Sequence, residues 1–240
     1  MNVDRLRFTA ESAAFMDPLL ALSATRPLGT EIYTYCVLAP ANHYGQLWAG
    51  VDDGGRLAAA LLDNGHYRTL LLPGTAAVGD VAADTAQFFC GIPAADRFPV
   101  MGNSAPARQA SPAVRSHSGK DLAKVLAFLR NRPLTPQDEA ALVFRIRAVN
   151  AGLSDVFTLS DDAGRLCACA HIMAKNRRYA LIGNVYTAPD CRGRGMAGTL
   201  LAACEARAAE EGLLPVLYCR KEMASYYRAH GYRKLKNHAL

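Results

Sequence analysis

The segment that most restricts the fold is residues 181–197, where an apolar stretch, a glycine-rich turn and a helix follow one another. The apolar stretch predicts a buried strand, and Pro189 ends it because proline cannot continue a ladder of backbone hydrogen bonds. The turn 192–195, with the sequence Arg-Gly-Arg-Gly, leads into a helix predicted over 195–211 and stopped by Gly212. A glycine-rich loop and a helix N-terminus must therefore lie just beyond the end of a buried strand.

A loop of this kind is suited to hold a phosphate group. Two glycines let the backbone approach a ligand closely, and the unpaired N–H groups of the first helical turn point toward it. The helix dipole favours negative charge at the same place, and Arg192 and Arg194 add positive charge. We predict a phosphate site at 192–197, and a glycine-rich turn that only allows close packing is the alternative.

Two other phosphate-binding folds fit the surrounding sequence poorly. Gly193-x-Gly195-x-x-Gly198 has dinucleotide-fingerprint spacing, but residues 188–192 separate it from its strand. Too few residues follow Arg220 to build the rest of a doubly wound parallel sheet. A P-loop is excluded because no Gly-Lys-Ser/Thr sequence follows the turn.

The surrounding elements predict an α+β fold with a mixed, mostly antiparallel sheet flanked by helices. Short hairpin turns join the three strands before the glycine-rich turn, so these strands are expected to pair antiparallel. The predicted elements, in chain order, are helices 121–130 and 135–149, strands 155–159, 165–173 and 178–187, helix 195–211, strand 214–219, helix 221–230 and strand 232–235.

The first hundred residues carry no chemical motif and predict a smaller α+β unit. Its predicted elements are a helix within 9–24, an ambiguous segment 31–38, strands 46–51, 56–62, 67–72 and 98–101, and a helix 81–90. The segment 102–119 is rich in serine and has almost no large apolar side chains, which is typical of a linker. We therefore divide the chain into an N-terminal domain 1–102, a linker 103–118 and a C-terminal domain 119–240.

The charge distribution favours a polyanionic ligand in the last third of the chain. Residues 1–160 carry 14 Lys and Arg against 14 Asp and Glu, whereas residues 161–240 carry 13 against 7. The basic residues are not interleaved with stacking aromatics, so nucleic acid is a disfavoured partner. No apolar stretch is long enough to span a membrane, and residues 1–20 do not have the pattern of a signal peptide. The seven scattered cysteines form no CxxC pair, so we expect no metal site and reduced, mostly buried thiols in a cytoplasmic protein.

Beyond these patterns, the chain resembles a known family. Arg192-x-x-Gly195-x-Ala197, preceded by a strand that ends Val185-Tyr186-Thr187-x-Pro189, resembles the acyl-CoA motif of the GNAT N-acetyltransferases. Residues 217–218 and 224–232 resemble the family's second strand–helix block. The resemblance covers about 181–234, extends back to about 119 by element order, and implies acetyl transfer from acetyl-CoA to a primary amine. The N-terminal half looks like the degenerate acetyltransferase-like half found in one branch of the superfamily.

The resemblance also implies where acetyl-CoA would bind. In this family the strands corresponding to 180–187 and 214–219 diverge, and the pantetheine lies between them like an extra strand. The backbone of Val185 and Thr187 would bond its amides, and residues 192–197 would hold the pyrophosphate. The implied cofactor contacts are Val185, Tyr186, Thr187, Arg192, Gly193, Arg194, Gly195, Met196, Ala197 and Arg220.

Two residues are candidates for a catalytic role. Tyr227 aligns with the family's thiolate-protonating tyrosine, although it is also a plausible core residue. Its rivals are Tyr218, Tyr226 and Tyr232. Asn184 is expected to position the amine or a water molecule.

The general base is not evident from the sequence. The family often uses a glutamate on the strand that corresponds to 178–187, but no carboxylate lies between Lys175 and Thr187. His171 on the preceding strand suits a proton acceptor, and a core histidine is the alternative reading. The acceptor is expected to be a small-molecule or peptide amine, and the chain is compatible with a homodimer. A non-catalytic acyl-CoA-binding or sensing protein of the same fold is the alternative function.

Overall fold

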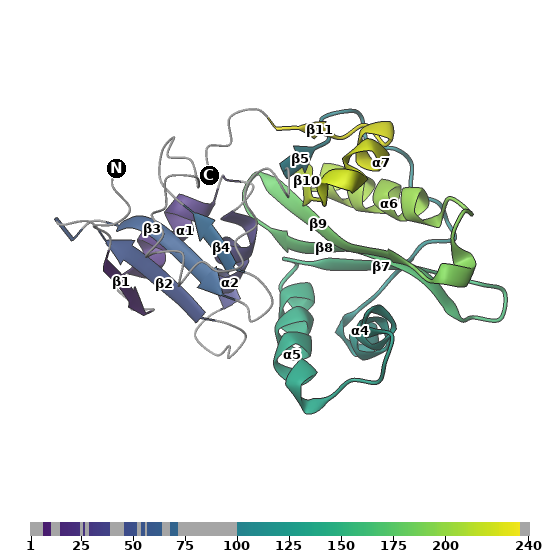
Figure 1. The fold of residues 1–240 in the computed structure, drawn as a ribbon, viewed down its shortest axis with the longest axis horizontal. Coiled ribbons are helices and arrows are strands. Elements are labelled where there is room, and N and C mark those ends of the chain that lie inside the picture. The colour runs from purple at the N-terminus through teal and green to yellow at the C-terminus, as the bar shows by residue number, and fades with distance from the viewer. Residues whose placement is uncertain are drawn as a thin grey trace.

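The computed structural model describes two sheets, one of four strands and one of seven (Figure 1). The described residues are 7–10, 15–24, 26, 29–38, 46–51, 54, 55, 57–63, 68–71 and 100–235. The predicted helix 81–90 therefore lies outside them. Six cysteines in the described part are free and buried, and Cys90 lies outside it.

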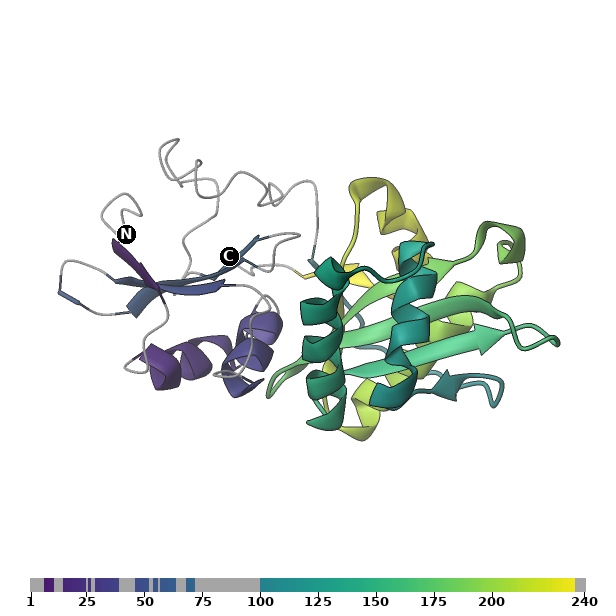
Figure 2. The ribbon, with the colours of Figure 1, turned by 90° about the horizontal axis from the view of Figure 1, so that it is seen from below.

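The smaller sheet belongs to the N-terminal half and is antiparallel throughout, in the order β1-β2-β3-β4. Two helices pack on one face of this sheet (Figure 2), with Leu19, Ile32, Leu47 and Leu62 buried between the layers. The elements are β1 (Arg7–Ala10), α1 (Met16–Ser23), α2 (Thr30–Leu38), β2 (Gln46–Val51), β3 (Leu57–Asp63) and β4 (Arg68–Leu71).

The structure corrects one expectation for this half and decides another. The predicted helix within 9–24 is wrong at its start, because residues 7–10 pair with β2 and the helix begins only at Met16. The ambiguous segment 31–38 is helical. Its buried residues Ile32, Tyr35 and Cys36 follow helical spacing and face the core.

The larger sheet is mixed and mostly antiparallel, in the order β11-β5-β10-β9-β8-β7-β6, which confirms the predicted fold class. Helices α4 and α5 lie on one face, and α6 and α7 lie on the other (Figure 1). The elements are β5 (Val100–Gly102), β6 (Arg115–Ser116), α4 (Leu122–Arg130), α5 (Pro136–Asn150), β7 (Asp155–Ser160), β8 (Leu166–Lys175), β9 (Tyr179–Thr187), α6 (Met196–Glu210), β10 (Leu214–Tyr218), α7 (Ala224–Ala229) and β11 (Arg233–Lys234).

Strand β5 corrects the prediction that a strand at 98–101 completes the N-terminal half. It lies between β10 and β11 in the larger sheet and pairs antiparallel with both. Met101 anchors it there, since its side chain is 1% exposed and its sulfur lies 3.4 Å from the Cys219 thiol. Strand β5 thus supplies a strand that the short C-terminal segment alone does not provide.

A hairpin turn of the larger sheet attaches the two halves to each other. The side-chain amide of Asn176 donates to the carbonyls of Ser23 (2.9 Å) and Arg26 (2.7 Å) at the end of α1. The backbone N–H of Arg177 donates to the Ala24 carbonyl, and Thr34 Oγ1 donates to the Lys175 carbonyl. Helix α2 therefore lies against the β8–β9 hairpin in a fixed position.

We expect Asn176→Ala to lower the free energy of unfolding by about 2–3 kcal/mol, because it removes several hydrogen bonds of a buried amide and leaves carbonyls unpaired. Urea denaturation followed by circular dichroism measures this loss. The exposed Asn150 is the matched control, and Asn150→Ala is expected to change stability by less than about 0.5 kcal/mol. Equal stability of the two variants would contradict the role of Asn176 in joining the halves.

Candidate functional site

The central feature of the larger sheet is the divergence of its two parallel strands. Strands β9 and β10 pair from Tyr179↔Leu214 to Ile182↔Leu217, and their register goes no further. Residues 179–182 are buried, whereas 183–187 are all only partly buried. Among the described residues, no strand pairs with the edge of 183–187 that faces β10. This edge offers free backbone N–H and C=O groups to an extended ligand.

A β-bulge lies where the two strands part. In the β8–β9 ladder, His171 is opposite Gly183 and Cys169 is opposite Tyr186, so Asn184 and Val185 together face one residue of β8. Asn184 has a φ of 51°, in the left-handed region that asparagine tolerates better than most residues. The bulge changes the direction of the β9 backbone at the point where its pairing with β10 ends.

His171 and Asn184, the two polar candidates from the sequence, meet at this bulge. Asn184 Nδ2 donates to His171 Nδ1 over 3.3 Å. Burial, with smaller contributions from the neighbouring Arg145 and His117, holds the pKa of His171 well below its usual value, so the ring is neutral. His171 is 2% exposed, and its Nε2 has no hydrogen-bond partner among the described residues.

The glycine-rich turn follows β9 through a short 3-10 helix, Pro189–Cys191. Gly193 has a φ of 76° and Gly195 a φ of 73°, and Gly195 is the N-cap of α6. No described atom lies within 4 Å of a Cβ built on either glycine, so backbone conformation rather than crowding requires them. The turn is exposed and leaves the first N–H groups of α6 accessible to a ligand.

Hydrogen bonds from basic side chains fix the shape of this loop. Arg192 Nε donates to the Thr187 carbonyl over 3.2 Å, and Arg194 donates to the Asp190 carbonyl over 3.4 Å. Arg165, which sequence reasoning did not single out, bridges Asp161 (3.0 Å) and Asp190 (2.6 Å). Its guanidinium lowers the pKa of both carboxyl groups.

The linker contributes to a depression beside the loop. Arg108, Gln109 and Ser111 face Gly195, Gly198 and Thr199 across an open hollow of about 390 Å³. Arg108 Nε bonds Glu205, a buried carboxylate on α6, over 3.0 Å. The sequence pattern of the linker gave no indication of this placement, because it contains no motif and no periodicity.

Tyr227 lies on α7, on the same side of the sheet as α6, and packs against the core. Its ring meets those of Tyr226 and Tyr232 edge to face, at centroid distances of 5.3 and 5.9 Å. Burial, with smaller effects from Cys219 and Tyr226, raises the pKa of Tyr227 to about 12. The phenol therefore keeps its proton at neutral pH. Its rival Tyr232 is fully buried and belongs to the core.

Arg220 is exposed and follows β10 at its open end. The part of the chain that the structure describes holds no group of three or more His, Cys, Asp or Glu that suits a metal ion. Among the described helices, none is long and apolar enough to cross a membrane.

Comparison with known proteins identifies the domain that contains this site. Residues 153–234 match the family model described as the Acetyltransferase (GNAT) domain. This part of the chain is therefore a GNAT-type domain. The matched residues include the diverging strands, the glycine-rich loop and α7. No curated protein sequence matches the chain.

Solved structures similar to this chain extend over nearly its whole length. A GNAT-family acetyltransferase from Colwellia psychrerythraea has a TM-score of 0.57 and 14% identity, covering 95% of this chain and 96% of that one. A Drosophila protein has a TM-score of 0.59 and 14% identity over 96% and 95%. A tandem GNAT protein from the clavulanic acid biosynthesis pathway has a TM-score of 0.53 and 14% identity over 95% of each chain. At this identity the similarity shows a shared fold.

The left-handed conformation of Asn184 predicts an unusual order of stability. Asn184→Ala and Asn184→Gly both lose the bond to His171, and they differ only by a Cβ at positive φ. We expect the alanine variant to be less stable than the glycine variant by about 1 kcal/mol, the reverse of the usual order in a strand. Parallel urea denaturation curves measure the difference. An alanine variant as stable as the glycine variant would show that residue 184 does not have a positive φ.

Proposed function

We propose that this protein is an acetyl-CoA-dependent N-acetyltransferase that transfers the acetyl group to a primary amine. The observation that carries the proposal is the divergence of β9 and β10, whose open edge leads into the glycine-rich loop and the N-terminus of α6. Acetyl transfer is the general activity of the GNAT domain that residues 153–234 match. The amine acceptor and the residue roles below are part of the proposal.

The residues at the site fit an extended thioester with a diphosphate. We assign the pantetheine to the unpaired edge of β9, at Val185, Tyr186 and Thr187. The two positive-φ glycines and the free N–H groups of α6 suit the diphosphate, and the adjacent hollow beside Arg108 has room for the rest of the nucleotide. The proposed contacts in the loop are Arg192, Gly193, Arg194, Gly195, Met196 and Ala197, with Arg220 at the end of β10.

The chemistry proposed for the site is a direct displacement. The amine nitrogen attacks the thioester carbonyl, a C–N bond forms, and the C–S bond breaks to release a thiolate. Tyr227, whose raised pKa keeps it protonated, donates its proton to that thiolate. Asn184, held by neutral His171, orients the amine or the water that takes its proton.

The N-terminal half is assigned a supporting role. We propose that residues 1–102 are a degenerate acetyltransferase-like domain joined by the linker 103–118 to the domain 119–240, with β5 exchanged into the larger sheet. Similarity over nearly the whole chain to a tandem GNAT protein supports this division. In this arrangement α1 and α2 would shape the acceptor side of the site.

Gly195→Val tests the diphosphate site. A β-branched residue at a φ of 73° distorts the loop, so we expect acetyl-CoA to bind about tenfold more weakly or worse in calorimetry. Gly212→Val is the matched control, because Gly212 has a φ of 68° and equal open space at the far end of α6. This control is expected to lose stability and keep its affinity. Unchanged affinity of Gly195→Val for acetyl-CoA would show that the diphosphate does not bind to this loop.

Tyr227→Phe tests the proton donor. We expect turnover to fall by about 10²-fold while the dissociation constant of acetyl-CoA changes little, since the phenol acts only on the leaving group. The measurement is release of free thiol with a panel of primary amines, and Tyr226→Phe is the control. An unchanged rate in Tyr227→Phe would show that this residue packs in the core and does not donate the proton.

A second function is an acyl-CoA sensor that binds without turnover. Strand β9 contains no carboxylate to serve as a base, and this observation favours the sensor. Thiol release separates the two functions. Binding of acetyl-CoA without thiol release for any amine would identify the sensor.

A further inference from the structure

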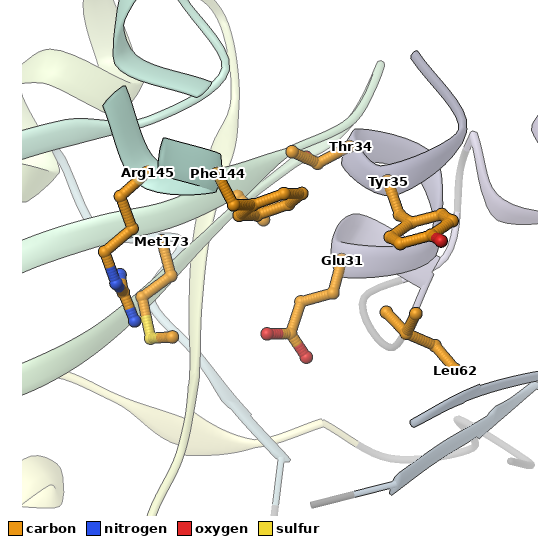
Figure 3. Close-up of a pocket in the computed structure, with 8 residues that line it drawn as sticks. Glu31, Thr34, Tyr35, Leu62, Phe144, Arg145 and Met173 are labelled. Carbon is orange, nitrogen blue, oxygen red and sulfur yellow. The ribbon is translucent and has the colours of Figure 1, made fainter. Parts of the chain in front are cut away.

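A pocket lies between the two halves, on the face of the larger sheet that carries α5 (Figure 3). Its walls come from four elements, one of which is strand β3 with Leu62. Helix α2 supplies Glu31, Thr34 and Tyr35, helix α5 supplies Phe144 and Arg145, and strand β8 supplies Met173. The cavity has a volume of about 20 Å³, enough for one water-sized group such as an ammonium head.

This pocket lies next to β9, one of the two diverging strands. A Cβ on Gly183 would overlap the sulfur of Met173, so the floor of the pocket lies directly against the residue that precedes Asn184. Glu31 lies near the end of β10, the other strand. There its charge adds to the effect of burial in raising the pKa of Tyr218. A molecule held in the pocket is therefore close to the point where the strands part.

Opposite charges enter the pocket from opposite walls. The carboxylate of Glu31 points from α2 toward Met173. The guanidinium of Arg145 extends from α5 on the other side of Met173 (Figure 3). Arg145 Nε is buried and has no hydrogen-bond partner among the described residues. A buried guanidinium nitrogen without an acceptor is costly unless a ligand supplies one.

A second buried donor lies near Arg145. The Nδ1 of His171 accepts from Asn184, so the ring proton is on Nε2, which also lacks a partner among the described residues. Arg145 is close enough for its charge to lower the pKa of His171. The unsatisfied donor of Arg145 suits a carboxylate, and Glu31 opposite it suits an ammonium group.

We propose that this pocket binds the acceptor, and that the acceptor is a small aminocarboxylate: a primary amine that carries a carboxylate in the same molecule, as amino acids do. The inference rests on the proposed acetyl transfer and adds the substrate class. Glu31 holds the ammonium end, Arg145 holds the carboxylate, and Phe144 and Met173 cover the apolar part. The carboxylate that β9 lacks is thus contributed by the N-terminal half.

The test compares each standard amino acid with its carboxamide, which keeps the amine and removes the negative charge. Thiol release from acetyl-CoA is measured for both. We expect kcat/KM for the best amino acid to exceed that for its amide by about tenfold or more. This ratio corresponds to the loss of one charge-assisted hydrogen-bond pair. Amides that equal or exceed the acids would overturn the inference and point to peptide N-termini or simple amines.

Two variants test the assigned residues. Arg145→Gln is expected to remove the preference for acid over amide, a change that general destabilisation does not produce. Arg147→Gln, on the same helix, is the control that keeps it. Glu31→Gln is expected to raise KM for the amino acid about tenfold or more and to leave the acetyl-CoA dissociation constant unchanged, with Asp17→Asn as its control. A preference retained in Arg145→Gln would contradict the role of Arg145.

Failure of the proposed function is distinguishable from failure of this inference. If acetyl-CoA does not bind in calorimetry, the proposed acetyltransferase activity is wrong. Direct titration of the protein with amino acids and their amides still shows whether the pocket binds an aminocarboxylate. If acetyl-CoA binds and neither amino acids nor amides bind or release thiol, the pocket is not an acceptor site.

Discussion

The structure depends on how far two parallel strands stay paired. Strands β9 and β10 share backbone hydrogen bonds only up to Ile182 and Leu217, and beyond this point the sheet has a gap. The bulge at Asn184 turns the backbone just there, and the glycine-rich loop begins where the free arm of β9 ends. The candidate groups Asn184 and His171 lie at the point where the pairing ends.

The sequence predicted the second half of the fold well because its signals are local. Hairpin turns, the Thr135 cap of α5 and the glycine at each end of α6 fix elements regardless of their neighbours. The placement of β5 was not predictable, since a three-residue strand gives no periodicity and its partner follows more than a hundred residues later. The start of α1 was misjudged for a similar reason, because residues 7–10 are strand only through their pairing with β2.

The candidate site was predictable only in part. Residues 192–197 have a recognisable composition, and in the structure Gly193 and Gly195 both have a positive φ. Glu31 and Arg145 carry no sequence signal, because each is one charged residue on a helix without a distinctive pattern. What joins them is the packing of α2 against β8, where Thr34 donates to the Lys175 carbonyl, while Asn176 holds the end of α1 from about 150 positions away in the sequence.

The hydrogen bonds within the loop have a consequence for how an anion would associate. Arg192 and Arg194 are tied to carbonyls of their own loop, and Arg165 clamps Asp190 from the neighbouring hairpin. A loop that already has its final shape loses little conformational entropy when it is occupied. A diphosphate would thus bind to a preformed loop, and binding would mainly displace water rather than order the chain.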